Sequence, residues 1–213
     1  PFFDSSSIPT FLLSQFTSGS VKVALSGDGG DELFAGYNRY KLARKISKFN
    51  KITPHLFRLI LNKIIKIIPQ SKYDVYSFKM QKKLGIHAAG EKLYKLANCI
   101  VCSNNDELYD TIISHWQNLL EKDTNIEFLH EKNIICKIPD FIENIEERMQ
   151  FLDQNLYLQD DILTKVDRAS MASSLEVRVP LLDHRLVQAS WRLPLKYKLS
   201  QGKTKFILKE ILK

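Results

Sequence analysis

The segment at residues 26–32, with the sequence SGDGGDE, places three glycines and three acids directly after an apolar run. Glycine lets a backbone pass close to a ligand or adopt positive φ values. A site for phosphate alone would favour basic side chains, so the acids indicate a metal ion bridging to phosphate, or a carboxylate that acts on a substrate. Turn and N-cap roles explain any one of these acids, but not the whole segment.

A second segment, DDILTKVDRASMASSLEVRVPLLDHR at residues 160–185, is dense in charge within a partly apolar pattern. Such charges are either paired structurally or line a site. Ion pairing explains most of them, including Glu176, Arg178, Asp183 and Arg185, and Asp183 is suited to cap the next helix. It explains Lys165 less well, because that lysine lies near the centre of an apolar helix face.

The elements that must position these residues are mostly helices. Residues 21–25 form one clear strand, whose near-continuous apolarity predicts burial on both faces, as in a parallel sheet. A helix is expected from near Asp31 toward Phe49, and apolar periodicity predicts further helices at 54–68, 73–86, 91–102, 105–120, 183–192 and 203–213, with two more between 141 and 173. A lone strand leaves its backbone groups unpaired, so we expect the rest of a parallel sheet upstream.

Composition excludes several classes of protein. Hydrophobic residues make up 44% of the 213 residues, no apolar run reaches the ~20 residues of a membrane span, and no signal peptide is recognisable at the start. The three cysteines form no disulfide framework, which favours the cytoplasm. Cys99 and Cys102 have CxxC spacing, but they fall in a helical apolar pattern and are interpreted as core residues.

The net charge of +7 has a local source, because residues 39–72 hold ten Lys or Arg and no acid. The interpretation favoured here is the solvated face of amphipathic helices. A nucleic-acid surface is the alternative, but no known nucleic-acid motif accompanies the charge. We therefore expect neither a nucleic acid nor a membrane as a partner.

Taken together, SGDGGDELFAGYNRY and LTKVDRASMASSLEVRVPLLDHR resemble the synthetase domain of the glutamine-dependent asparagine synthetases. The tail GKTKFILKE resembles the end of that family's sequences. The likeness runs from about Pro1 to Lys213, and residues 45–140 are matched only by position. The resemblance implies an α/β fold of the ATP-pyrophosphatase type, adenine nucleotide alpha hydrolase-like, with a parallel sheet flanked by helices.

The resemblance also implies a reaction. ATP and Mg²⁺ would activate the side-chain carboxylate of aspartate as β-aspartyl-AMP, releasing pyrophosphate. Ammonia, delivered from an N-terminal glutaminase domain, would then displace AMP. Both steps suit the residue types, since adenylation needs a cation and a lysine near the phosphates, and the amine needs a carboxylate to accept its proton.

Site roles follow residue by residue from the same resemblance. Asp31 matches the metal-binding aspartate, and Asp28 matches the catalytic acid, which is commonly Glu in the family. Tyr37 matches the tyrosine placed against that acid, and Lys165 is chosen as the adenylation lysine. The remaining nucleotide-binding candidates are Ser26, Gly27, Gly29, Gly30, Arg168 and Lys203, the last two being runners-up for the lysine role.

The family's Ser-Gly-Gly-x-Asp-Ser pyrophosphate loop and its N-terminal cysteine nucleophile do not occur in the 213 residues. The chain is therefore expected to be the C-terminal part of a synthetase domain, inactive alone. Two alternatives stay open. One is a related amidotransferase or β-lactam synthetase-like enzyme acting on another carboxylate, and the other is a non-catalytic helical binding module. Homodimer formation also stays open.

Overall fold

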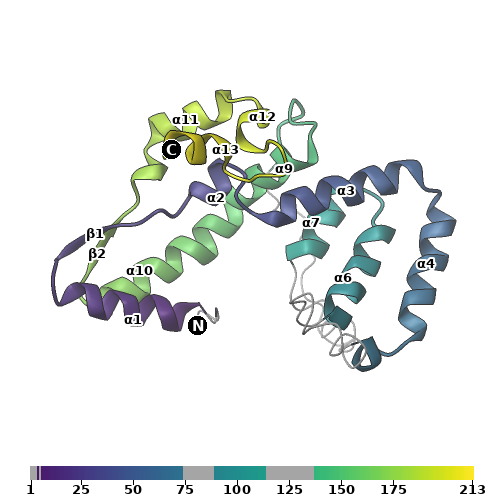
Figure 1. The fold of residues 1–213 in the computed structure, drawn as a ribbon, viewed down its shortest axis with the longest axis horizontal. Helices are drawn as coiled ribbons and strands as arrows, with labels where there is room; N and C mark the ends of the chain where they lie inside the picture. The colour runs from purple at the N-terminus through teal and green to yellow at the C-terminus, as the bar shows by residue number, and fades with distance from the viewer. Residues whose placement is uncertain (1–3, 5, 74–88, 114–136) are drawn as a thin grey trace. The chain divides into compact units, whose positions relative to one another are not determined.

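The computed structural model describes residues 4, 6–73, 89–113 and 137–213. The chain divides into two compact units, Pro1–Tyr40 with Ile134–Lys213, and Lys41–Asn133. Helices predominate in both units (Figure 1). None of the helices in the described ranges is long and apolar enough to cross a membrane.

The first unit contains a parallel pair of strands. β1 (Val23–Leu25) pairs with β2 (Glu176–Arg178), with Ala24 opposite Val177. The strand predicted at 21–25 is thus confirmed over its last three residues, and β2 is a second strand that was not predicted. The predicted burial is wrong for the described chain, because Val23 and Leu25 are 42% and 73% exposed. A paired strand lies at the edge of its neighbour, and the faces of a sheet are covered only by helices or another layer packed against it.

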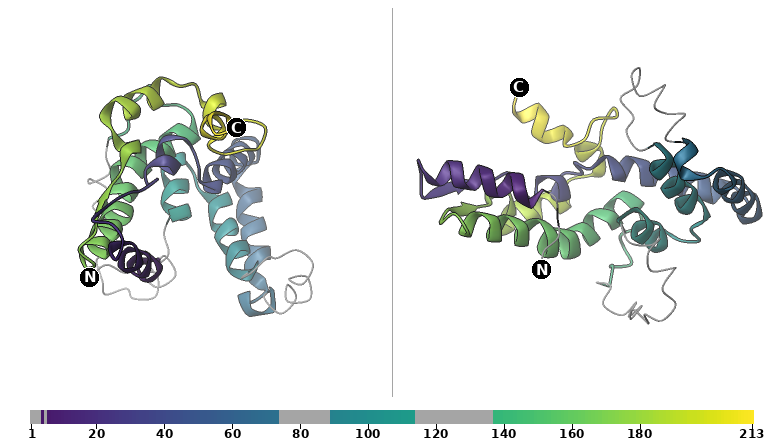
Figure 2. Two further views of the ribbon diagram at one scale, coloured as in Figure 1. Left: turned by 60° about the vertical axis from the view of Figure 1, so that its left-hand side comes forward. Right: turned by 90° about the horizontal axis from the view of Figure 1, so that it is seen from below.

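A continuous helical segment runs through α9 (Ile145–Leu152), the π-helix η1 (Asp153–Leu163) and α10 (Thr164–Met171). Two successive helices were predicted here, but no break separates them, and a long π-helical stretch joins them. α1 (Ser7–Ser18) lies alongside α10 in every view (Figures 1 and 2). The segment therefore connects the N-terminal helix to the residues that precede β2.

Short elements complete the first unit after β2. The 3₁₀ turn η2 (Pro180–Leu182) leads into α11 (His184–Arg192), whose N-cap Asp183 accepts a hydrogen bond from the Arg185 backbone N–H at 2.9 Å, as predicted. α12 (Leu195–Lys198), which the sequence pattern did not predict, and α13 (Phe206–Ile211) follow.

Lys198, the last residue of α12, lies in the core of this unit with 2% of its surface exposed. Its Nζ donates to Gln150 Oε1 at 3.1 Å and lies 5.1 Å from the centre of the Trp191 ring. Burial lowers the pKa of the Lys198 amine to about 8. A turn that carries two further lysines, Lys203 and Lys205, begins directly after it.

The helix expected from residue 31 toward Phe49 is interrupted. α2 (Gly30–Leu33) is a single turn, and four residues separate it from the start of α3 (Asn38–Ile52). Between them, Ala35 adopts a positive φ of 52°, and the Gly36 N–H donates to the Asp31 carbonyl at 2.8 Å. A Cβ on Gly36 would lie 1.8 Å from Asp31 Oδ1. A side chain at this position would therefore displace the Asp31 carboxylate.

The second unit holds most of α3 together with α4 (His55–Ile67), α6 (Ala89–Val101) and α7 (Asn105–Ile113). Asn62 Nδ2 on α4 donates to the Ala97 carbonyl at 2.6 Å, and Arg58 Nη1 donates to the Ile100 carbonyl at 2.9 Å. α4 and α6 are therefore antiparallel neighbours. The helices predicted at 54–68 and 91–102 are confirmed, as is the first half of the one at 105–120. Residues 74–88 and 114–136 lie outside the described residues.

Cys99 and Cys102 are both buried with free thiols. Burial raises the pKa of the Cys99 thiol to about 12, so it stays neutral at physiological pH. The interpretation of this CxxC pair as core cysteines is confirmed.

Candidate functional site

The glycine- and acid-rich loop follows β1, as the sequence predicts. The Ser26 N–H donates to the Arg178 carbonyl at 2.9 Å and so extends the strand pairing by one residue. The Ser26 hydroxyl donates to the Asp28 carboxylate, while the Asp28 N–H donates back to Ser26 Oγ at 3.3 Å. Asp28 is therefore held by its own loop, at the carboxyl end of a parallel strand, where ligands of α/β sheets bind.

Gly29 is required by both its conformation and its surroundings. Its φ is +81°, and a Cβ would lie 2.3 Å from Leu182 Cδ2 on η2. A Cβ on Gly27, by contrast, would meet nothing within 4 Å. The loop thus packs closely against η2 on one side and leaves its backbone open at Gly27.

Asp31 forms an ion pair that the sequence analysis did not foresee. Lys205 Nζ lies 2.9 Å from Asp31 Oδ1, and the Asp31 side chain is 37% exposed. Lys205 is the N-cap of α13 and adopts a positive φ of 50°. The tail motif GKTKFILKE pointed to this region, but the residue taken from it, as a runner-up to Lys165, was Lys203. Which lysine of the turn reaches Asp31 depends on the backbone conformation of the turn. Three of its residues have positive φ values, which the periodicity of the sequence does not reveal: Gln201, Gly202 and Lys205.

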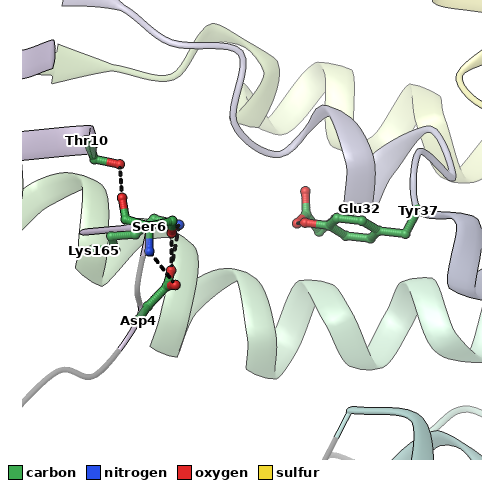
Figure 3. Close-up of polar contacts among 6 residues, drawn as sticks. All are labelled: Asp4, Ser6, Thr10, Glu32, Tyr37 and Lys165. Atoms are coloured by element: carbon green, nitrogen blue, oxygen red, sulfur yellow. Dashed lines mark hydrogen bonds and ion pairs between the residues drawn. The ribbon is translucent and has the colours of Figure 1, made fainter. Parts of the chain in front are cut away.

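Glu32, next to Asp31, is 1% exposed and is a second residue that sequence reasoning missed. Tyr37 was expected against Asp28, but its hydroxyl donates to Glu32 Oε1 at 2.5 Å (Figure 3). Burial raises the pKa of the Glu32 carboxyl, and burial together with Glu32 raises the pKa of the Tyr37 hydroxyl. Tyr37 therefore acts as a hydrogen-bond donor at neutral pH.

Lys165 has partners from the N-terminal segment. Its Nζ donates to Asp4 Oδ2 at 3.0 Å and to Ser6 Oγ at 2.8 Å (Figure 3). Hydrogen bonds from Ser6, together with Lys165, lower the pKa of Asp4 to about 2. Lys165 makes no ion pair or hydrogen bond with Asp28 or Asp31, all three being described residues. Figure 3 shows this cluster apart from the pair formed by Glu32 and Tyr37.

The two runners-up for the lysine role are exposed. Arg168 on α10 and Lys203 in the turn make no side-chain hydrogen bond or ion pair with the part of the chain that the structure describes. Glu176 pairs with Arg178 at 2.7 Å, and Asp183 pairs with Arg185 at 2.9 Å, both at the surface. Structural pairing, as expected, accounts for these four charges.

The chemistry of Asp31 fits Mg²⁺ bound together with a nucleotide. Across residues 4, 6–73, 89–113 and 137–213, no three His, Cys, Asp or Glu side chains gather as a metal cluster. Mg²⁺ is usually held by one or two carboxylates, with substrate phosphates and water completing its shell. A partly exposed carboxylate beside a lysine and an open backbone at Gly27 match that pattern better than an all-protein metal cage does.

Comparison with known protein families gives a match along the whole chain. The model of the asparagine synthase family matches residues 1–213. No solved structure matches the chain.

Curated relatives extend this result. The chain is 27% identical over 211 residues to asparagine synthetase [glutamine-hydrolyzing] 1 of Bacillus subtilis (strain 168). The matched region covers 99% of this chain and 31% of that protein. It is 29% identical over 220 residues to a putative asparagine synthetase [glutamine-hydrolyzing] of Mycobacterium bovis, covering 100% of this chain and 30% of that protein. The chain therefore spans about a third of the length of these relatives.

Proposed function

Because the chain belongs to the asparagine synthase family, we propose that it is the C-terminal part of a synthetase domain whose whole protein converts aspartate to asparagine. The substrates would be aspartate, ATP and ammonia released from glutamine by a glutaminase domain. β-Aspartyl-AMP would be the intermediate. The relatives' names mention asparagine synthesis and glutamine hydrolysis, and both are carried to this chain as part of the proposal.

One observation carries the proposal, namely the pair between Asp31 and Lys205 at the end of the loop after β1. Asp31 would hold Mg²⁺, which when bound neutralises phosphate charge. Lys205 would leave Asp31 and donate to the nucleotide's phosphate oxygens. A preorganised cation that faces negative charge as it develops lowers the barrier to adenylation. In this structure Asp31 and Lys205 pair with each other. In the nucleotide complex Asp31 would instead face the positive charge of Mg²⁺, and Lys205 would face the negative charge of the phosphates.

The proposed reaction balances in two steps. A carboxylate oxygen of aspartate attacks the α-phosphorus of ATP, and the bond to pyrophosphate breaks. Ammonia then attacks the acyl carbon, the bond to AMP breaks, and the nitrogen loses a proton to a carboxylate. Asp28 is the candidate acceptor, because it lies in the loop beside Asp31 and its hydrogen-bond partner among the described residues is Ser26 of the same loop.

The test uses the full-length protein that contains this chain. With ATP, Mg²⁺, ammonia and aspartate labelled with ¹⁸O in its side-chain carboxylate, we expect asparagine, pyrophosphate and AMP carrying one ¹⁸O atom. Label in AMP reports the acyl-adenylate directly. ADP formation, or turnover with another carboxylate but not aspartate, would refute the proposed reaction or its substrate.

Variants of the same protein assign the lysine role. Lys205→Met should slow adenylation about 10²- to 10³-fold, as expected for the loss of one preorganised donor. Lys203→Met, two residues away and exposed, is the matched control. Asp31→Asn should raise the Mg²⁺ concentration needed for half-maximal rate, because an amide lacks the charge that this hard cation prefers. A wild-type adenylation rate for Lys205→Met would remove Lys205 from the site.

A further inference from the structure

Arg39 is clamped between two aromatic rings in the first unit. Its Cζ atom lies 4.1 Å from the centre of the Tyr37 ring and 4.6 Å from that of Tyr157. Nη2 lies 2.8 Å from Asp153 Oδ2 at the start of η1. Asp153 is fully buried and also accepts a hydrogen bond from the Tyr40 hydroxyl at 2.5 Å. A planar guanidinium can stack and pair at the same time, which an ammonium group cannot.

The clamp is connected to the candidate site through Tyr37. The Tyr37 ring contacts Arg39 on its face, and its hydroxyl holds Glu32. The Glu32 carbonyl accepts a further hydrogen bond from Gln154 Nε2 at 3.1 Å. The start of η1 is therefore linked to α2 in two ways. Asp153 is linked to Glu32 through Arg39 and Tyr37, and Gln154 bonds the Glu32 carbonyl directly.

α2 needs such contacts, because a helix of one turn is not stable alone. Its orientation must come from what its side chains touch. Successive residues on a helix point about 100° apart, so fixing Glu32 toward the interior also fixes the direction of Asp31. Asp31 then points to Lys205 rather than into the core.

We propose that Arg39 is a positioning residue for the metal and nucleotide site, acting through the Tyr37 ring and Glu32 on the orientation of Asp31. The inference rests on the proposed function, since it takes Asp31 as the Mg²⁺ ligand. It predicts that loosening the clamp weakens cation binding in a protein that still folds.

The test measures Mn²⁺, standing in for Mg²⁺, bound to the full-length protein in the presence of pyrophosphate, by electron paramagnetic resonance of the free ion. Arg39→Met should weaken Mn²⁺ binding about 10- to 100-fold, the usual effect of losing a group that orients a metal ligand. Arg39→Lys keeps the ion pair with Asp153 but not the flat stacking, so we expect an intermediate loss. Arg192→Met, on the exposed surface of α11, is the matched control and should bind Mn²⁺ normally.

Arg39→Met also removes the ion pair between Arg39 and the buried Asp153, which can unfold the protein. Tyr157→Leu avoids this, because it removes one face of the clamp and leaves the pair intact. For each variant, melting temperature and circular dichroism report folding separately from Mn²⁺ affinity. A purely structural role would lower the melting temperature without changing the affinity of the folded protein.

The outcomes separate the two proposals. Mn²⁺ affinity within twofold of wild type in folded Tyr157→Leu and Arg39→Lys variants would overturn the positioning role, whatever the wild-type enzyme makes. Weakened binding in these variants, but not in Arg192→Met, supports it. Wild-type protein that binds Mn²⁺ but forms no ¹⁸O-labelled AMP would refute the proposed reaction and leave the positioning result standing.

Discussion

Replacing Lys198 with methionine is expected to stabilise the folded protein at pH 7, although the change removes a hydrogen bond. The Lys198 amine is almost fully buried, and burial lowers its pKa from 10.5 to about 8. One pKa unit corresponds to about 1.4 kcal/mol, so keeping the amine protonated at pH 7 costs about 3 kcal/mol in the folded state.

Two losses offset most of that gain. Methionine cannot donate to Gln150 Oε1, a loss of about 1 to 1.5 kcal/mol. It also loses the cation–π contact with Trp191, about 0.5 to 1 kcal/mol. Since methionine keeps an unbranched stem of similar length, packing should change little. The free energy of unfolding should therefore rise by about 1 kcal/mol at pH 7.

The pH dependence gives the sharper test. Between about pH 8 and 10.5 the unfolded chain binds more protons at Lys198 than the folded chain does, so wild-type stability rises with pH in this window. Lys198→Met lacks that rise. Its advantage of about 1 kcal/mol should therefore vanish at pH ~9 and become a deficit of about 2 kcal/mol by pH ~10.5.

Urea unfolding followed by circular dichroism at pH 7, 8.5 and 10 measures both effects. Lys196→Met, at an exposed position on the same short helix, is the control and should show a constant difference from wild type. If Lys198→Met is less stable than wild type at pH 7 and the difference does not move with pH, the amine is not desolvated and the reasoning is wrong.

Three further predictions concern the site and its surroundings. Asp4→Asn should remove a stabilising contribution that wild type has above about pH 4 and loses as the pH falls through about 2, because the folded pKa of Asp4 is lowered; acid unfolding curves will test this. Lys165→Met in the full-length enzyme should cost ~3 kcal/mol in adenylation if its amine meets the nucleotide, whereas ordinary adenylation in a folded variant would assign it a structural role with Asp4 and Ser6. Gly36→Ala should raise the Mg²⁺ concentration needed for half-maximal rate, since the new methyl group would overlap Asp31 Oδ1; an unchanged Mg²⁺ requirement would mean that the loop adapts.

Local signals in the sequence were sufficient for the loop and most helices. The run before Ser26 indicated a strand, and the glycines and acids indicated a site at its end. The break at Ala35 could not be predicted, because a left-handed alanine leaves the apolar periodicity intact. The spacing of apolar residues also cannot show that α9 is an α-helix and η1 a π-helix. The two types differ in which backbone groups are hydrogen-bonded, and the side-chain pattern does not report this.

The candidate site was predicted in part, because its partners come from distant turns. Asp31 was selected as a site candidate from its motif and stays a prediction, while its contact with Lys205 depends on backbone angles 174 residues further along the chain. The pairing of Glu32 with Tyr37 spans only five residues, yet an expectation carried over from the family directed Tyr37 to Asp28 instead. The closeness of Asp4 to Lys165 arises from the packing of α1 on α10, which no sequence motif encodes.

The π-helix η1 makes the chain sensitive to a change in residue number rather than in residue type. Each residue added to or removed from a helix rotates everything beyond it by about 100°. A deletion in η1 would leave α9 in place and turn α10 about its own axis, so that Lys165 would face away from Asp4. The number of residues between Asp153 and Lys165 therefore determines the rotation of α10 about its axis. Variants that differ in the length of this segment should differ in which face of α10 meets α1.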